Sequence, residues 1–338
     1  MKAVIIDAPH TMRVTSDVPM PRAGVGQVVV RNTAVGICAG DLYIYQGKNP
    51  YARMPAIGGH EIAGYVHEVG AGAAGIAAGE FVVVEPFMGC GQCYACRVGK
   101  PNCCKNLQII GAHVPGGFAE FVAAPATNIH KVPAGLSPTW ASFAEPVAIG
   151  VQACRRGQVS ADDLVLILGA GPIGLALIEV ARAKGAHVWV TDISAERLAF
   201  AKTLGAETIA SDDRLLPTIL EMTDGDGMPV VIEATGNEKA MESTVALVAA
   251  GGRIVIVGLV AAGKLIALPG LDFTRKELTV VGSRASTQCF PEALHLLATG
   301  QIHYPNVATE FSMWDAPQVF AEMDAQPGKV HKGVLMIA

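Results

Sequence analysis

Four cysteines lie close together in the first third of the 338-residue sequence. They form the pattern Cys90-x₂-Cys93-x₂-Cys96-x₇-Cys104. Four thiolates at this spacing suit tetrahedral zinc, and a shell closed by four protein ligands leaves no position for a substrate. Five of the eight cysteines, Cys103 included, fall within fifteen residues, which favours metal binding over a set of disulfides. The pattern therefore predicts a structural zinc site, in which Cys103 could replace its neighbour Cys104.

A second set of possible metal ligands is spread over the same part of the chain. Cys38 stands in Val35-Gly-Ile-Cys-Ala-Gly-Asp41, His60 and Glu61 stand in Gly58-Gly-His-Glu-Ile62, and Glu145 precedes Pro146. Taken singly, these residues could be a core thiol, turn residues and a surface carboxylate. Together, a thiolate, an imidazole and carboxylates with one open position make a catalytic zinc site that can polarise a hydroxyl.

A glycine-rich motif, Gly169-Ala-Gly171-Pro172-Ile173-Gly174, lies between an expected strand and an expected helix. Its glycines would permit a tight turn, a close approach of backbone to a pyrophosphate, and close packing of the helix on the sheet. Asp192 ends the next expected strand, where a carboxylate accepts from the ribose hydroxyls and repels a 2′-phosphate. This favours NAD over NADP, although Asp192 could instead cap the following helix.

The sequence around these residues shows two different patterns of expected secondary structure. Short β-branched runs separated by Gly and Pro occupy the first 140 residues, at 28–32, 62–68, 81–85 and 118–123, and predict a mostly antiparallel β domain. From 164 onward strands alternate with helices, which predicts a parallel sheet. We expect strands at 164–168, 187–191, 230–233, 253–258 and 278–282, with helices at 173–184 and 195–204. A helix at 291–299 and a last strand at 332–337 are expected to return to the first domain, which would span 1–145 plus 286–338 around a nucleotide-binding domain at 146–285.

Composition narrows the possible partners and location. The net charge is −5 and no basic run interleaved with aromatics occurs, which argues against nucleic acid as a partner. No stretch reaches the roughly 18–20 apolar residues of a membrane helix, and the start is too short and too early acidic for a signal peptide. We therefore expect a cytoplasmic protein with a small-molecule substrate and no membrane partner.

The sequence resembles a known family through motifs that occur in the same order over essentially the whole chain. They are Gly58-Gly-His-Glu61, the four-cysteine cluster, Gly116-Gly-Phe-Ala-Glu120, Glu145-Pro146 and Gly169-Ala-Gly-Pro-Ile-Gly174. The family is the zinc-containing medium-chain alcohol dehydrogenases, and Glu145 at the last ligand position resembles the sorbitol and threonine dehydrogenase branch. The resemblance implies a GroES-like catalytic domain, a Rossmann domain that binds NAD, two zinc ions per chain, and a dimer or tetramer.

The resemblance also implies roles for particular residues. Cys104, rather than Cys103, would complete the structural zinc site. Either Glu61 or Glu145 would bind the catalytic zinc beside Cys38 and His60, and Val257-Gly258-Leu259 would lie near the nicotinamide.

Within the branch, several segments look similar to bacterial L-galactonate and L-gulonate 5-dehydrogenases. They are Pro101-Asn-Cys-Cys104, Ile110-Gly-Ala-His113, Ala234-Thr-Gly-Asn237 and Gly282-Ser-Arg284. A sugar acid needs a fixed donor for its carboxylate, and Arg284 could supply a bidentate one, with His113 as a second substrate contact. Alternatively, Arg284 binds a phosphate or forms a salt bridge. A polyol dehydrogenase, an L-threonine dehydrogenase and a catalytically silent nucleotide-binding protein remain alternatives.

The chain departs from the family pattern at its proton relay. The family usually has Ser or Thr two residues after the catalytic Cys and His five residues after it, whereas this chain has Gly40 and Tyr43. The proton of the alcohol must then leave through Tyr43, Tyr45 or a chain of waters.

Overall fold

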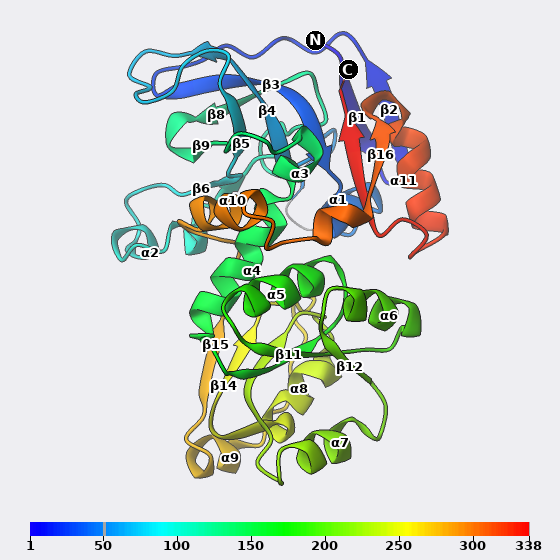
Figure 1. Cartoon of the computed structure of the whole chain (residues 1–338). Helices are drawn as coiled ribbons and strands as arrows, with labels where there is room; N and C mark the ends of the chain where they lie inside the picture. Colours follow the sequence, from blue (N-terminus) through cyan, green and yellow to red (C-terminus); the bar gives the residue numbers. More distant parts are fainter. Residues whose placement is uncertain (50–51, 338) are drawn as a thin grey trace. The chain divides into compact units, whose positions relative to one another are not determined.

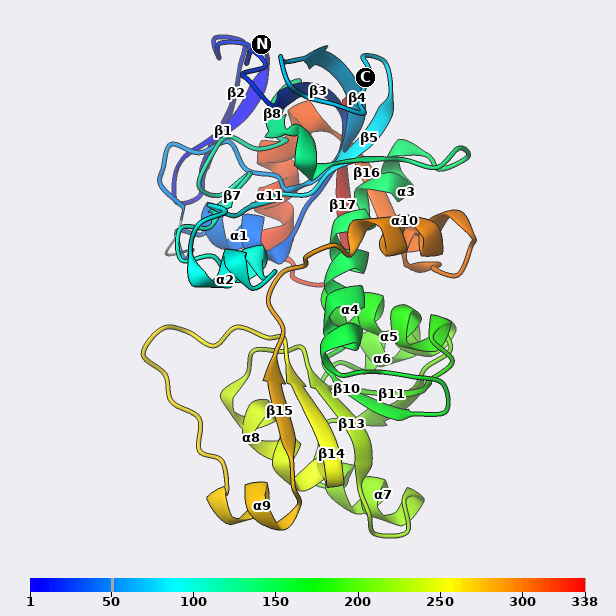
Figure 2. The same cartoon turned by 90° about the vertical axis from the view of Figure 1, so that its left-hand side faces the viewer.

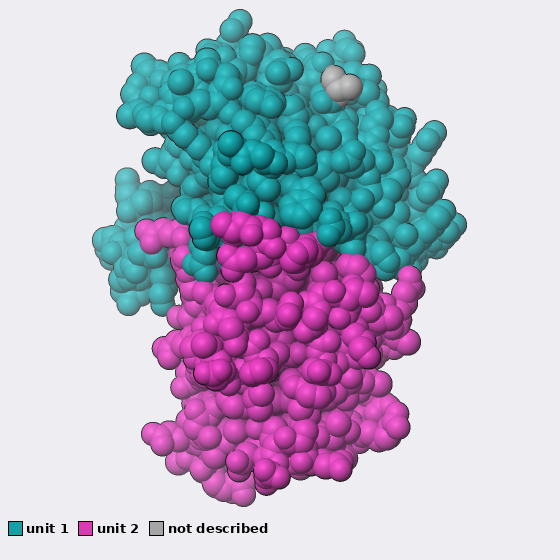
Figure 3. All heavy atoms as spheres, in the orientation of Figure 1, with its two compact units in different colours: residues 1–145, 290–298, 305–338 teal, residues 146–289, 299–304 magenta. Residues whose placement is uncertain are grey.

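The computed structural model describes residues 1–49 and 52–337 and divides into two compact units (Figure 3). Unit 1 comprises residues 1–145, 290–298 and 305–338, and unit 2 comprises 146–289 and 299–304. The segments 286–289 and 299–304, which the sequence-based division assigns to the first domain, thus pack with unit 2.

Unit 2 is built on a six-stranded parallel sheet, in the order β12-β11-β10-β13-β14-β15 (Figure 1). The strands are β10 (Leu164–Leu168), β11 (His187–Asp192), β12 (Glu207–Ala210), β13 (Met228–Glu233), β14 (Val248–Ile256) and β15 (Thr279–Gly282). The first strand, β10, lies in the middle, and the chain runs outward from it first on one side and then on the other. This is the strand order of a dinucleotide-binding Rossmann fold, as the alternating pattern predicted.

Helices connect the strands of unit 2 and cover the sheet. They are α4 (Ala144–Arg156), which begins at the end of unit 1, α5 (Pro172–Ala183), α6 (Ala195–Thr203), α7 (Leu215–Met222), α8 (Glu238–Leu247) and α9 (Gly270–Arg275). Leu166, Val231 and Ile254 on adjacent strands are buried in one apolar cluster with Ile219 and Val245 of the covering helices. Near-continuous apolar runs in the strands reflect a sheet that is buried on both faces.

Unit 1 contains a seven-stranded, mostly antiparallel sheet (Figure 2). Its main path runs β16-β17-β3-β4-β5-β9, and β8 pairs with β3 as well. The strands are β3 (Gln27–Gly36), β4 (Glu61–Val69), β5 (Phe81–Val84), β8 (Phe121–Pro125), β9 (Ile129–Lys131), β16 (Ala308–Ser312) and β17 (Lys332–Met336). Val30, Val35, Ile62, Phe118 and Phe320 share its apolar core.

Smaller elements complete unit 1. They are the hairpin β1 (Ala3–Ala8) and β2 (Thr11–Thr15), the pair β6 (Phe87–Met88) and β7 (Gln108–Ile109), and the helices α1 (Ala39–Tyr45), α2 (Tyr94–Arg97), α3 (Pro138–Ser142), α10 (Phe290–Ala298) and α11 (Ala316–Ala325), with 3₁₀ turns at η1 (Pro101–Cys103), η2 (Ala126–Asn128), η3 (Tyr304–Val307) and η4 (Met313–Asp315). In the described part of the chain, no helix is long and apolar enough to span a membrane.

Candidate metal and cofactor sites

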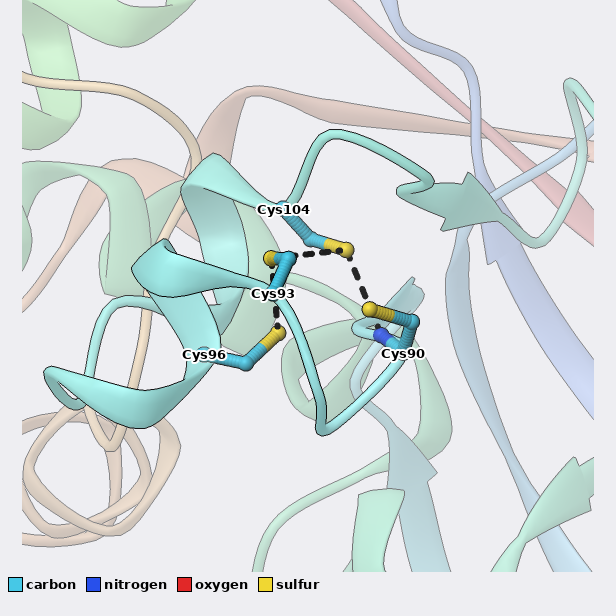
Figure 4. A group of neighbouring side chains, drawn as sticks. All are labelled: Cys90, Cys93, Cys96 and Cys104. Atoms are coloured by element: carbon cyan, nitrogen blue, oxygen red, sulfur yellow. Dashed lines mark hydrogen bonds between the residues drawn. The ribbon is translucent and has the colours of Figure 1, made fainter.

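The four-cysteine group forms on a short lobe of unit 1. Cys93 precedes α2, Cys96 lies within it and Cys104 follows η1, so these tight turns bring all four sulfurs toward one point (Figure 4). The ligand atoms of Cys90, Cys93, Cys96 and Cys104 lie within 4.8 Å of one another. Their closeness and chemistry suit one tetrahedral zinc with a closed shell.

Backbone amides favour thiolates at this site. The N–H groups of Cys96 and Lys105 lower the pKa of Cys93 to about 6. The amides of Cys90 and Asn106 also lie 3.3 Å from the sulfur of Cys104, where they donate to it. Cys103, in contrast, is exposed and does not join the group, so the structure brings in Cys104 and not its neighbour.

The second metal-binding group comprises Cys38, His60 and Glu61, whose ligand atoms also lie within 4.8 Å of one another. Cys38 follows β3 and is the N-cap residue of α1, whereas His60 directly precedes β4. The pairing of β3 with β4 places Gly36 opposite Glu61, which brings the two chain segments together. A thiolate, an imidazole and a carboxylate from these two segments leave room for a substrate, unlike the four-cysteine shell.

Asp41 holds His60 in place, and the sequence analysis assigned it no role. Its buried carboxylate accepts from the backbone N–H of Cys38 at 2.9 Å and of Gly59 at 3.0 Å, and it lies 3.5 Å from Nδ1 of His60. A carboxylate on Nδ1 leaves Nε2 for a metal and fixes the orientation of the ring. The spacing of Asp41 three residues after the N-cap, as in a capping box, was the available signal.

The electrostatics around His60 suit a cation. Burial disfavours its charged form, but the negative charges of Asp41 and Cys38 outweigh burial and raise the pKa of His60 well above its usual value. An environment that favours a positive charge on this ring also favours a metal cation beside it. The donor set and its charge therefore fit zinc.

Glu61 has a partner that the sequence did not reveal. Nζ of Lys332, in β17, lies 2.5 Å from the Glu61 carboxylate and donates to the carbonyl of Ile37 at 3.0 Å. Both side chains are buried, with exposed fractions of 2% and 1%. A buried ion pair is costly to break because the remaining charge has no solvent. Lys332 therefore fixes the position of Glu61.

Glu145 is buried in the first turn of α4. Burial raises its pKa to about 7, helped by the negative charges of Glu61 and Asp41 and opposed by the positive charges of His60 and Lys332. Glu145 thus belongs to the same electrostatic cluster as the second metal-binding group, although it is not one of the three side chains whose ligand atoms meet there.

The glycine-rich motif of unit 2 forms the turn from β10 into α5. Gly169 has φ +104°, and a Cβ on it would lie 2.7 Å from Cγ2 of Thr235, while a Cβ on Gly174 would overlap the carbonyl of Gly169. Nothing lies within 4 Å of a Cβ position on Gly171, the N-cap of α5. The turn thus leaves the helix N-terminus open, as binding of a pyrophosphate requires.

Asp192 ends β11 beside this turn. Its carboxylate accepts from the backbone N–H of Ala170 and of Ser194, each at 2.8 Å, and lies 3.8 Å from the guanidinium of Arg197. The cap of α6 is Ser194, whose side chain accepts from Arg197 N–H. Asp192 is therefore not the helix cap that the alternative interpretation suggested.

Two loops follow the central strands β13 and β14. The backbone carbonyl of Glu233 accepts from Val257 N–H at 2.9 Å and Gly258 N–H at 3.1 Å, while its carboxylate accepts from Thr235 and Gly236. A Cβ on Gly236 would lie 2.6 Å from the carbonyl of Leu259. The buried Glu233 therefore ties the loop at 234–237 to the segment Val257–Leu259, and sequence reasoning gave it no role.

The remaining predicted residues lie apart from the metal ligands in the chain or at the surface. Tyr43 is 54% exposed on α1, whereas Tyr45 is packed in the core with its ring 5.6 Å from that of Phe320. His113 lies on an exposed turn of unit 1, and Arg284 lies on an exposed segment after β15 in unit 2.

A Rossmann sheet with an open glycine turn, together with a Cys/His/Glu metal group, defines a metal-dependent dehydrogenase. Family models match both parts: the alcohol dehydrogenase GroES-like domain over residues 24–134 and the zinc-binding dehydrogenase model over 172–299. The chain belongs to the zinc-containing medium-chain alcohol dehydrogenase family.

Individual relatives agree with this assignment. The chain is 37% identical to L-galactonate-5-dehydrogenase of Escherichia coli K12, over 85% of this chain and 84% of the relative. It is 36% identical to L-threonine 3-dehydrogenase of Pyrococcus abyssi, over 95% and 94%. A solved structure of RspB from E. coli CFT073 with NADH superposes with a TM-score of 0.90 and 31% identity, covering 100% of this chain and 99% of that one. The protein is thus a zinc-binding, NAD(P)-dependent oxidoreductase that acts on CH–OH groups, as predicted.

Proposed function

We propose that this enzyme oxidises a secondary hydroxyl of a sugar acid, such as L-gulonate or L-galactonate, with NAD as the hydride acceptor. The L-galactonate-5-dehydrogenase relative supports the substrate class. Asp192 supports NAD over NADP, because its buried carboxylate at the end of β11 would repel a 2′-phosphate. The main support for zinc-dependent alcohol oxidation is that the ligand atoms of Cys38, His60 and Glu61 lie close together.

In this proposal each group has a defined task. Cys38, His60 and either Glu61 or Glu145 hold the catalytic zinc, which supplies polarisation of the substrate hydroxyl. Cys90, Cys93, Cys96 and Cys104 hold the structural zinc.

Other residues of the chain bind the cofactor and substrate. Gly169, Gly171, Pro172, Ile173 and Gly174 cradle the pyrophosphate, and Val257, Gly258 and Leu259 face the nicotinamide. Arg284 and His113 contact the substrate, and Tyr43 passes the proton toward solvent.

L-Threonine and a neutral polyol are the alternative substrate classes. L-Threonine is favoured by the relative from Pyrococcus abyssi, which matches more of the chain at nearly the same identity. A neutral polyol would give Arg284 no carboxylate to bind. A catalytically silent protein is disfavoured because such a protein has no use for a Cys38, His60 and Glu61 group with an open position.

NAD-linked activity against hexonates, hexitols and L-threonine tests the proposal, together with the zinc content of the purified protein. We expect two zinc ions per chain and the highest kcat/KM for a hexonate. A higher kcat/KM for L-threonine or for a hexitol would contradict the substrate class, and no turnover with one zinc per chain would favour the silent protein.

We also propose a cytoplasmic homo-oligomer. Thiolate ligands and a supply of NAD suit a reducing compartment. Unit 2 exposes Leu259 and Leu265 on the long loop between β14 and α9 (Figure 2), Leu271 on α9 and Val280 on β15. Sedimentation of the purified protein measures its oligomeric state, and a monomer would contradict this part of the proposal.

A further inference from the structure

Unit 1 has a pocket of about 310 Å³ that the proposed function does not use as a whole. Four parts of the chain line it: Ile5 of β1, Asp17 to Pro19, Arg53 with Pro55 to Ile57, and residues 112–115. Most of its wall is apolar, and the charged or titratable side chains in it are Asp17, Arg53 and His113. A small apolar cavity with a few polar groups is the usual form of a small-molecule site.

Two of these side chains can donate to an anion. Nδ1 of His113 accepts the backbone N–H of Ile109 at 3.0 Å, so Nε2 carries the proton of the neutral ring. Arg53 is exposed, and within residues 1–49 and 52–337 no carboxylate forms an ion pair with it. A guanidinium binds a carboxylate through two parallel hydrogen bonds, which gives direction as well as affinity.

One chain segment that lines the pocket leads to the catalytic metal group. Ala56 and Ile57 line the pocket, and Gly58, Gly59 and His60 follow them in the chain. The segment after His113 runs alongside: Gly116 N–H donates to Ile57 O at 2.8 Å, and Gly117 N–H to Gly59 O at 2.8 Å. Three residues of extended chain span at most about 10 Å, so the pocket lies within the reach of a short chain molecule from His60.

We propose that this pocket is the carboxylate subsite of the enzyme and that Arg53 is the residue that selects acidic over neutral polyhydroxy substrates. The inference rests on the proposed function and adds to it a place on unit 1 for the charged end of the substrate, with Arg53 as its donor in place of Arg284, which does not line the pocket. His113 donates from the second side of the same pocket. Asp17 repels the anion and limits its affinity.

The pocket holds the opposite charges of Arg53 and Asp17, so removing each charge should change the preference for acidic substrates in opposite directions. A purely structural role of these residues would not produce this opposite effect. The measured quantity is the ratio of kcat/KM for a hexonate to kcat/KM for the hexitol of the same configuration, which lacks only the carboxylate. Arg53→Gln is expected to lower this ratio about tenfold or more, mainly through KM, because it removes a charge-assisted pair. Asp17→Asn is expected to raise it by about twofold to fivefold, because it removes a nearby like charge.

Two further variants serve as controls. Arg53→Lys keeps the positive charge but lacks the two parallel N–H donors of the guanidinium. Its ratio is therefore expected to lie between those of Arg53→Gln and the wild type. Arg22→Gln removes another exposed arginine of unit 1, whose partner is Glu68, outside the pocket, and is expected to leave the ratio unchanged. If wild type prefers hexonates and neither Arg53→Gln nor Asp17→Asn moves the ratio, the subsite is refuted while the proposed function stands. If wild type oxidises only hexitols, both are refuted.

Discussion

Removal of the Lys332 charge should strongly destabilise unit 1. In Lys332→Met the side chain keeps its approximate length, but the Glu61 carboxylate loses its partner at 2.5 Å and the carbonyl of Ile37 loses a donor at 3.0 Å. Because Glu61 is only 1% exposed, water cannot replace the ammonium. Breaking a buried pair from one side typically costs about 3–5 kcal/mol, and we expect a loss of this size in the free energy of unfolding.

A matched control separates burial from geometry. Nζ of Lys131 lies 2.6 Å from the carboxylate of Glu80, almost the same distance, but the exposed fractions of these side chains are 57% and 29%. Lys131→Met should therefore change stability little. Urea titrations would follow the fluorescence of Trp140 and Trp314, which belong to unit 1, in a Trp189→Phe background and after removal of the catalytic metal. Equal losses in the two variants would refute the reasoning from burial.

Three further predictions concern the sites. A chelator should remove the catalytic zinc first and abolish turnover while far-UV circular dichroism stays unchanged, because only that site has an open position; loss of both metals together with unfolding would contradict this. Asp192→Ala should weaken NAD binding about tenfold and reduce the preference against NADP, because it removes an acceptor and a repulsive charge; a wild-type preference for NADP in titrations would contradict it. Tyr43→Phe should lower oxidation about 10–100-fold without loss of zinc, and the wild-type rate should still rise above pH 8. Gly40→Ser with Tyr43→His should shift the pH profile of the oxidation rate toward neutral pH. The serine side chain has room, because a Cβ at residue 40 would meet only His60 at 3.7 Å and Cys38 at 3.9 Å. Identical pH profiles would leave solvent as the proton acceptor.

The nucleotide-binding unit could be predicted closely because its signals are local. The strand expected at 164–168 has those bounds in β10, and helices α5 and α6 begin within one residue of their predicted starts. The glycine motif specifies a turn through the conformations of its own residues. Strand β12 was not predicted, because its four residues Glu207–Ala210 are mostly half-exposed and lack an apolar run.

The first unit was predicted less completely because its contacts join distant residues. The expected strand at 118–123 begins at Phe121, since Phe118 and Ala119 instead pair with the N-terminal segment through Val4 and Ala3. Helix α1 was not predicted, although Asp41 stands in its first turn and forms a capping box with Cys38. A seven-residue helix is too short to show a clear period.

Lys332 shows what unit 1 gains when the chain returns to it after unit 2: a buried cation beside Glu61. It lies 271 residues from Glu61 in the sequence, in a strand whose apolar pattern predicts only a buried position. Strand β17 pairs with β3 through Val334 and Gly36, next to the turn that carries Cys38. The same strand thus extends the sheet and brings a cation to a cluster of acidic side chains, in which Asp41, Glu61 and Glu145 are buried and Cys38 is half-buried. Lys332 pairs with Glu61 and His60 lies beside Asp41, whereas burial raises the pKa of Glu145 to about 7. A divalent cation in the metal-binding group would favour the charged carboxylate of Glu145, which links metal binding to the part of the sheet that the C-terminal strand completes.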